Sequence, residues 1–260
     1  MQRFIIIILI PFIHFSIYSN QNQKKSELVF PDEKPIEGYW GEAESLETSK
    51  DLKIIEDISE EASTKKIENA RKMFNLSLSI FKSSEIQIQN KKSEYEKEVN
   101  LEDKYTWQKK ARENNREKEL RKITIDARQN SIIPLVKGMN YLDKIENPIV
   151  KKSPIYIDLK ASLFREYIKH QFALKSYNLA VDMLDRYIEL SDKYEAEAEP
   201  HKILAACLEK QEIQASKYKK DALAFSIRSK KNHHLMRYTE LAFGKGSNQY
   251  NKLAEKVSRE

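Results

Sequence analysis

The chain has 260 residues, of which 40% are apolar and 33% are charged, with only 5 glycines and 7 prolines. Such a chain can bury a core, but it lacks the turn residues that a sheet-rich fold requires, so long helices are favoured. The net charge of +6 is modest, and the single cysteine, Cys207, excludes an internal disulfide.

The N-terminus has the layout of an export signal. Residues 1–3 carry one positive charge, and residues 4–15 form an apolar run of 12 residues that a polar segment follows. A transmembrane helix requires roughly 20 apolar residues, which is longer than this run. We therefore predict a signal peptide over residues 1–19, cleaved near Ser19, with an uncleaved N-terminal membrane anchor as the alternative.

Residues 20–60 are rich in acids and are broken by two prolines and two glycines. Because apolar side chains are sparse, this segment is predicted to be an acidic flexible tether. The adjacent aromatic residues Tyr39 and Trp40 admit two interpretations. They form a docking peptide that orders on a partner, or they pack back onto the protein.

Residues 61–146 are predicted to form a region of long helices. No Pro or Gly occurs between residues 59 and 129, and a looser apolar stripe follows residue 101. The apolar period is too irregular for clean heptads, so we expect a helical hairpin or coiled coil. Pro134 is expected to interrupt the second helix, with a short amphipathic helix after it. The clearest apolar stripe, at steps of three and four residues, consists of Ile67, Ala70, Phe74, Leu78 and Phe81.

Pro148 and Pro154 bracket a segment that we interpret as a linker and a domain boundary. Residues 153–246 beyond it contain the best core candidates and predict four helices. Gly244 and Gly246 are expected to end the last helix, and residues 247–260 to form a charged tail. The apolar stripe of the fourth helix is expected to consist of Tyr218, Ala222, Phe225 and Leu235.

Residues 177–190 resemble the second helix of a tetratricopeptide repeat. That pattern requires a small residue, a bulky residue four positions later and another three positions after that, which Ala180, Leu184 and Tyr187 provide. The resemblance implies an antiparallel helical hairpin within residues 153–246, although Ile168 stands where the preceding helix should have a small residue. A second repeat should follow after about 34 residues and does not, so a regular array is not expected.

The whole chain also resembles, in style and composition, small envelope proteins of spirochaetes (Borrelia-like). That resemblance implies a periplasmic scaffold of flagellar structures or a stabilising partner of other envelope proteins. We therefore predict an all-α, non-enzymatic adaptor that binds a protein partner through residues 153–246, and self-association into a homo-oligomer stays open. Aromatic residues are frequent in binding hot spots, so the expected surface lies near Phe164, Tyr167, Tyr187 and Tyr194.

No constellation of residues indicates catalysis. His233 and His234 are adjacent and point to different faces of a helix, whereas zinc ligands are usually spaced by three or four residues. Five glycines leave no phosphate-binding loop, and Cys207 lies in an apolar run typical of a buried thiol. We predict no catalytic, cofactor-binding or metal-binding residues and no cofactor.

A basic stretch over residues 104–122 carries eight Lys or Arg residues against three Glu residues. Its simplest interpretation is a solvated helix face with Glu–Lys pairs. The alternative function is binding of an anionic surface, such as lipid headgroups in a peripheral membrane contact, or of nucleic acid. Export argues against nucleic acid, so no nucleic-acid partner is expected. The patch consists of Lys109, Lys110, Arg112, Arg116, Arg121 and Lys122.

Overall fold

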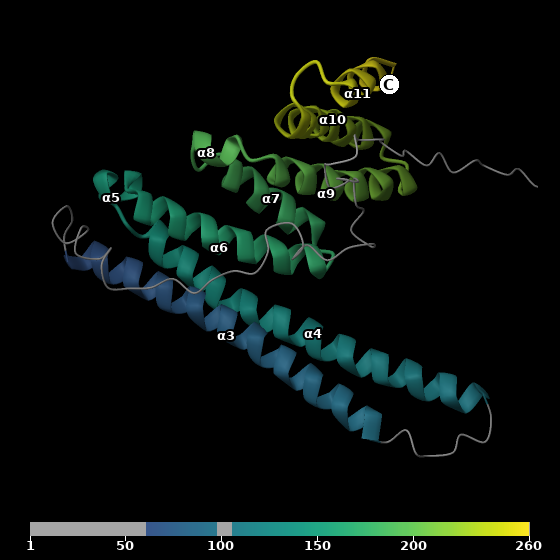
Figure 1. Cartoon of the computed structure of the whole chain (residues 1–260). Coiled ribbons are helices and arrows are strands. Elements are labelled where there is room, and N and C mark those ends of the chain that lie inside the picture. The colour runs from purple at the N-terminus through teal and green to yellow at the C-terminus, as the bar shows by residue number, and fades with distance from the viewer. Residues whose placement is uncertain (1–60, 98–105, 260) are drawn as a thin grey trace, which may run out of the picture.

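A computed structural model describes residues 61–97 and 106–259, and within these segments all regular structure is helical (Figure 1). The predicted all-α class is confirmed. The signal peptide, the acidic tether and its Tyr39 and Trp40 lie outside the described residues. No helix in the described segments is long and apolar enough to cross a membrane.

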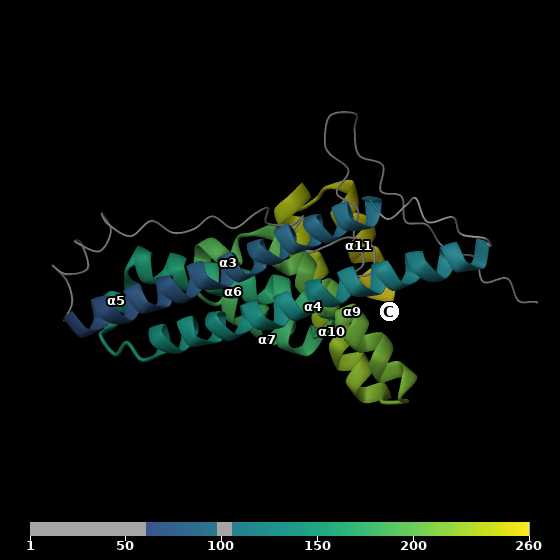
Figure 2. The same ribbon diagram turned by 90° about the horizontal axis from the view of Figure 1, so that it is seen from below.

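Two long helices, α3 (Glu61–Lys97) and α4 (Thr106–Asp143), run side by side as a hairpin that extends beyond the rest of the molecule (Figures 1 and 2). The predicted pairing of long helices is confirmed. Their contact is close at Ser77 and Ser131, which are both fully buried. Each serine hydroxyl donates to the other's backbone carbonyl, at 2.9 and 3.3 Å. Small residues at this crossing allow the two backbones to approach.

The expectation that Pro134 interrupts the second helix is wrong, because α4 continues through it to Asp143. Proline inside a helix removes one backbone hydrogen bond and disfavours the helix by about 3 kcal/mol. Packing on both sides offsets this cost, since Pro134 and Leu135 are buried and α4 contacts both α3 and α6.

The two prolines around the expected linker begin helices. Pro148 is the first residue of α5 (Pro148–Lys152), and Pro154 is the first residue of α6 (Pro154–Ala173). The side chain of Asn147 accepts a hydrogen bond from the Ile149 amide at 2.9 Å, and Ser153 caps α6 in the same way. Proline is favoured at this first position, where its missing N–H has no helical partner.

Together with α5 and α6, the remaining helices form the body of the molecule. They are α7 (Tyr177–Ile188), α8 (Asp192–Glu195), α9 (Ala198–Lys217), α10 (Asp221–Phe243) and α11 (Asn248–Arg259). The turn after α10 contains Gly244 and Gly246 at φ of 89° and 94°, which confirms that α10 ends there. Most of the charged tail expected after residue 246 is helical, because residues 248–259 form α11. Its apolar residues recur at helical spacing, as Tyr250, Leu253, Ala254 and Val257.

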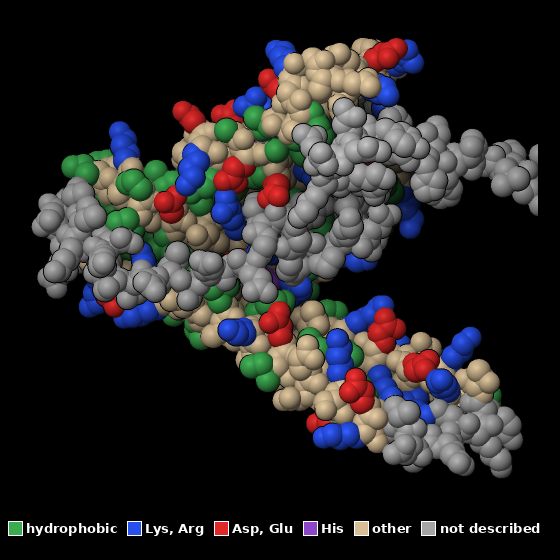
Figure 3. Space-filling view, viewed as in Figure 1, with side chains coloured by type: hydrophobic (Ala, Val, Ile, Leu, Met, Phe, Trp, Pro, Cys, Tyr) green, Lys and Arg blue, Asp and Glu red, His purple; other side chains and the backbone are tan. Residues whose placement is uncertain are grey.

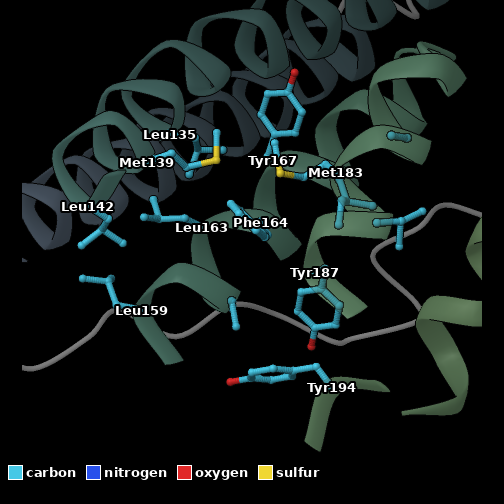
Figure 4. Close-up of a cluster of buried hydrophobic side chains, with 14 of the residues drawn as sticks. Leu135, Met139, Leu142, Leu159, Leu163, Phe164, Tyr167, Met183, Tyr187 and Tyr194 are labelled. Atoms are coloured by element: carbon cyan, nitrogen blue, oxygen red, sulfur yellow. The ribbon is translucent and has the colours of Figure 1, made fainter. Parts of the chain in front are cut away.

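The hairpin of α3 and α4 is called the arm. One hydrophobic cluster joins the base of the arm to the body (Figure 4). Phe74 of α3 and Leu142 of α4 belong to the same cluster as Leu163 of α6 and Leu184 of α7. Residues on both sides of the boundary expected near residue 150 therefore share one core. The arm's proximal half is part of this core, and only its distal half stands apart.

Candidate interaction surfaces

The aromatic residues expected near a binding surface lie inside the core. Phe164 and Tyr187 are completely buried, Tyr194 is 2% exposed and Tyr167 is 8% exposed. Figure 4 shows them among the core side chains, with Tyr187 beside Tyr194. Side chains this deeply buried offer a partner almost no area in the folded state, so these residues do not form a contact surface themselves, and a partner surface near them stays a prediction. Large aromatic side chains are frequent in binding hot spots, but they also fill cores, and the residue type alone does not distinguish the two.

Tyr187 is instead the centre of a polar network that connects three elements of the body. Its hydroxyl donates to a Glu197 carboxylate oxygen at 2.7 Å and accepts from the Arg165 Nε at 2.7 Å. Arg165 and Glu197 also pair directly at 2.7 Å. Burial, followed by the hydrogen bond to Glu197, raises the pKa of Tyr187, which therefore stays protonated and donates. This network fixes the segment before α9 against α6 and α7.

Tyr194 makes a parallel connection. Its hydroxyl donates to the Asp158 carboxylate of α6 at 2.6 Å, and its ring lies 4.9 Å from that of Tyr187. Burial is the main cause that raises the pKa of Tyr194, and Asp158 adds to it. Both tyrosines thus anchor the α7–α9 segment to α6.

The predicted basic patch lies on the distal half of the arm, where blue side chains are visible in Figure 3. Residues 106–122 contain seven Lys or Arg residues and three Glu residues. Arg121 pairs with Glu117 at 2.6 Å, one turn before it, and the Arg116 guanidinium lies 4.9 Å from the centre of the Tyr95 ring of α3. Lys109, Lys110 and Lys122 are exposed, whereas Arg112 is partly covered.

The distal arm has no buried side chain in its described part, from residue 85 to 97 and from 106 to 126. Its two helices are joined by polar contacts, chiefly a 2.5 Å hydrogen bond from the Tyr95 hydroxyl to Glu119. Lys91 lies 3.6 Å from the same carboxylate. Because helices that are polar all round gain little from burial, this part of the arm is only weakly stabilised by its own packing.

Two histidines that no sequence pattern indicated as a pair come together across the body. The Nδ1 atoms of His201 on α9 and His234 on α10 lie 3.0 Å apart, and the rings stack at 5.3 Å. Burial is the main cause that lowers the pKa of both histidines, and the pKa of His234 falls to about 3. The pair is therefore neutral. The residues are 33 positions apart, and no local spacing could reveal the pair. Among the described residues, no group of three His, Cys, Asp or Glu side chains is placed to hold a metal ion.

A shallow groove of about 440 Å³ lies where the arm meets the end of α6. Ile88, Leu120 and Ile125 of the arm form its apolar wall, and Arg128 and Ala173 lie at its base. Lys92, Glu117 and Thr124 add polar groups to its lining, and the groove offers an open surface for contact.

The FcpA family matches residues 19–260, which is nearly the whole chain. The chain belongs to the FcpA family. FcpA proteins are flagellar-associated proteins of the spirochaete type, in agreement with the resemblance to spirochaete helical proteins. The tetratricopeptide likeness is not confirmed by this match and stays a prediction, and no curated protein matches the chain.

Proposed function

We propose that this FcpA-family chain is a non-enzymatic scaffold in the periplasm, which binds and stabilises another protein of the flagellum or cell envelope. Membership of a flagellar-associated family supports the setting. The buried core and the polar network around Tyr187 make the body a rigid support. The only cysteine thiol is buried, and its burial raises the pKa of Cys207, which makes it a poor nucleophile.

The proposal rests mainly on the properties of the distal arm. Its helices extend well beyond the body, and their described residues bury no side chain there, yet they present a dense array of charges and the exposed Trp107. A segment of low local stability gains most when a partner covers it, because binding adds the burial that the segment lacks. We infer that the arm is the part of the scaffold that contacts the partner, and that residues 153–246 hold the arm in place and supply further contacts.

The proposal is tested with flagellar filaments isolated from a spirochaete that lacks the protein. The purified chain from Asn20 onward is mixed with these filaments, and the fraction that sediments with them is measured against concentration. The arm variant carries Lys109→Glu and Lys110→Glu. The matched control carries the same reversal on the body, at the exposed residues Lys151 and Lys152 of α5.

We expect saturable binding that the arm variant weakens and the body variant does not. Equal weakening by both variants would contradict the arm as contact surface. Absence of binding by the parent chain would contradict the scaffold proposal itself.

The exposed lysines of the arm also favour one alternative, an anionic-surface or nucleic-acid binder. That function predicts binding to anionic vesicles or duplex nucleic acid which falls steeply as salt rises, since each contacted phosphate releases counterions. A flat salt response, or binding to filaments alone, would exclude it.

A further inference from the structure

Large apolar side chains are exposed together at the tip of the α9–α10 hairpin. Phe225 is 67% exposed and Ile213 is 58% exposed, and Tyr218 and Leu223 beside them are also exposed. The stripe expected on the fourth helix is therefore wrong for Tyr218, Ala222 and Phe225, which face solvent. Contiguous exposed apolar side chains of this kind usually mark an interaction site.

Ile213 and Phe225 lie at the same level of the hairpin. Lys219, at φ of 56°, is the centre of the turn, and the two residues stand six positions before and six after it. They also share one face. On α9, Ile213 follows Glu212, which points at α10 and binds Arg228 at 2.6 Å.

On α10, Phe225 follows Ala224, which is buried. Each step to the next residue turns by about 100° around a helix, and the two helices are antiparallel, so both steps lead to the same side.

The C-terminal helix α11 packs on α10. Since α11 has 12 residues, it extends over about 18 Å of α10, which is about half of that helix. The hairpin tip lies beyond its end.

Basic side chains surround the apolar tip. Lys217, Lys219 and Lys220 are all exposed there, with Asp221 as the nearest acid in sequence. One segment of this same chain has the complementary chemistry. Residues 36–47 contain four Glu residues and no Lys or Arg, and they carry Tyr39, Trp40 and Leu46. Aromatic anchors flanked by acids fit an apolar surface flanked by lysines.

The positions of the elements favour a second copy as the source of that segment. The start of α3 and the hairpin tip lie toward opposite ends of the body in both views (Figures 1 and 2). A relaxed chain of the 20 residues between Trp40 and Glu61 spans roughly 25 Å, which is less than the length of α9 alone, about 30 Å. Docking within one chain would require a stretched tether, whereas docking between chains would not.

We propose that the α9–α10 tip binds residues 36–47 of a second copy of this chain, with Trp40 seated against Ile213 and Phe225. The contact joins two different surfaces, so it is head-to-tail and repeats from copy to copy. It does not depend on the scaffold role proposed above. A chain that binds filaments as a single copy, and one that self-associates without binding filaments, are distinguishable outcomes.

The experiment uses tryptophan fluorescence, because Trp40 and Trp107 are the two tryptophans of the chain. In a Trp107→Phe background, Trp40 is the sole reporter, and quenching by acrylamide measures its exposure. We expect quenching reduced by about threefold relative to a free peptide of residues 33–48, which corresponds to docking about two-thirds of the time. Dilution should remove this protection.

Two substitutions test whether the tip, and not the surface in general, protects Trp40. Phe225→Asp should raise quenching to the level of the free peptide. The control is Ile133→Asp on α4, where the replaced side chain is similarly exposed, at 55%, and it should have no effect. Both residues are exposed, so neither change should unfold the chain, and circular dichroism verifies this.

A mixing experiment decides between one chain and two. One chain carries Trp107→Phe with Phe225→Asp, and so has a reporter and a defective tip. The other carries Trp107→Phe with Trp40→Phe, and so has an intact tip and no tryptophan. Mixing the two should restore protection of Trp40. The proposal is overturned if Trp40 is as exposed in the parent as in the peptide, if Phe225→Asp leaves it protected, or if protection survives dilution and mixing restores nothing.

Discussion

Replacing Tyr187 by Phe separates a structural role of this residue from a role in binding. The substitution keeps the ring in the core and removes only the hydroxyl, which donates to Glu197 and accepts from Arg165, both at 2.7 Å. A hydrogen bond to a charged group contributes about 1.5–3 kcal/mol. Arg165 and Glu197 stay paired with each other and are about one-third exposed, so water partly replaces the lost hydroxyl. We therefore expect the free energy of unfolding to fall by about 2 kcal/mol, near the lower end of that range.

The assay is urea unfolding followed by circular dichroism, with the slope against urea checked for constancy. Tyr194→Phe removes one hydrogen bond to Asp158, whose side chain is mostly exposed, and should lower stability by about 1 kcal/mol. Tyr218→Phe makes the same chemical change at an exposed residue, and its effect should stay within about 0.5 kcal/mol. Unchanged stability of Tyr187→Phe together with lost partner binding would refute the structural role.

Three further outcomes follow from buried positions. Gly138→Ala adds a Cβ 2.9 Å from the end of the Leu163 side chain and 3.3 Å from the Ala70 carbonyl oxygen of α3. Crowding against this backbone atom should cost about 1–2 kcal/mol and outweigh the gain in helix propensity of about 1 kcal/mol, so urea unfolding should show a small net loss of stability. A net gain would mean that α3 and α4 shift apart freely. Burial lowers the pKa of His170 and His234 from 6.5 to about 3. As pH falls, the unfolded chain therefore binds protons at these histidines before the folded chain does. The stability they support is complete above about pH 6.5 and declines as pH falls toward 3. Urea unfolding at several pH values should show this slope, and His170→Gln should flatten it. Finally, Cys207 should react with a thiol reagent only as fast as the core opens, so immediate reaction in the absence of urea would contradict its burial.

Local patterns in the sequence were sufficient for the helices and for much of the core. Ile67, Ala70 and Phe74 were expected on one stripe, and all three are buried in the shared core. Gly244 and Gly246 were expected to end a helix, and their positive φ values provide the reason. These features depend on residues within one or two turns of each other, which a sequence displays directly.

Features that depend on distant residues were not predictable in this way. Pro134 was expected to break a helix, because its local cost is visible in the sequence, whereas the packing of α4 between α3 and α6 is not. Phe225 was expected in the core because it is large and apolar. Its exposure at the tip of the α9–α10 hairpin depends on where the other helices pack, which a local pattern does not show.

The continuity of α4 through Pro134 has a consequence for the whole molecule. A break there would have made a hinge between the arm and the body. Instead, the buried half of the same helix packs between α3 and α6, and at Gly138 both the Ala70 carbonyl of α3 and the Leu163 side chain of α6 come close, so the direction of the arm is set by the core. The core therefore fixes how the arm and the hairpin tip, the two proposed contact surfaces on the described residues, stand relative to each other within one copy.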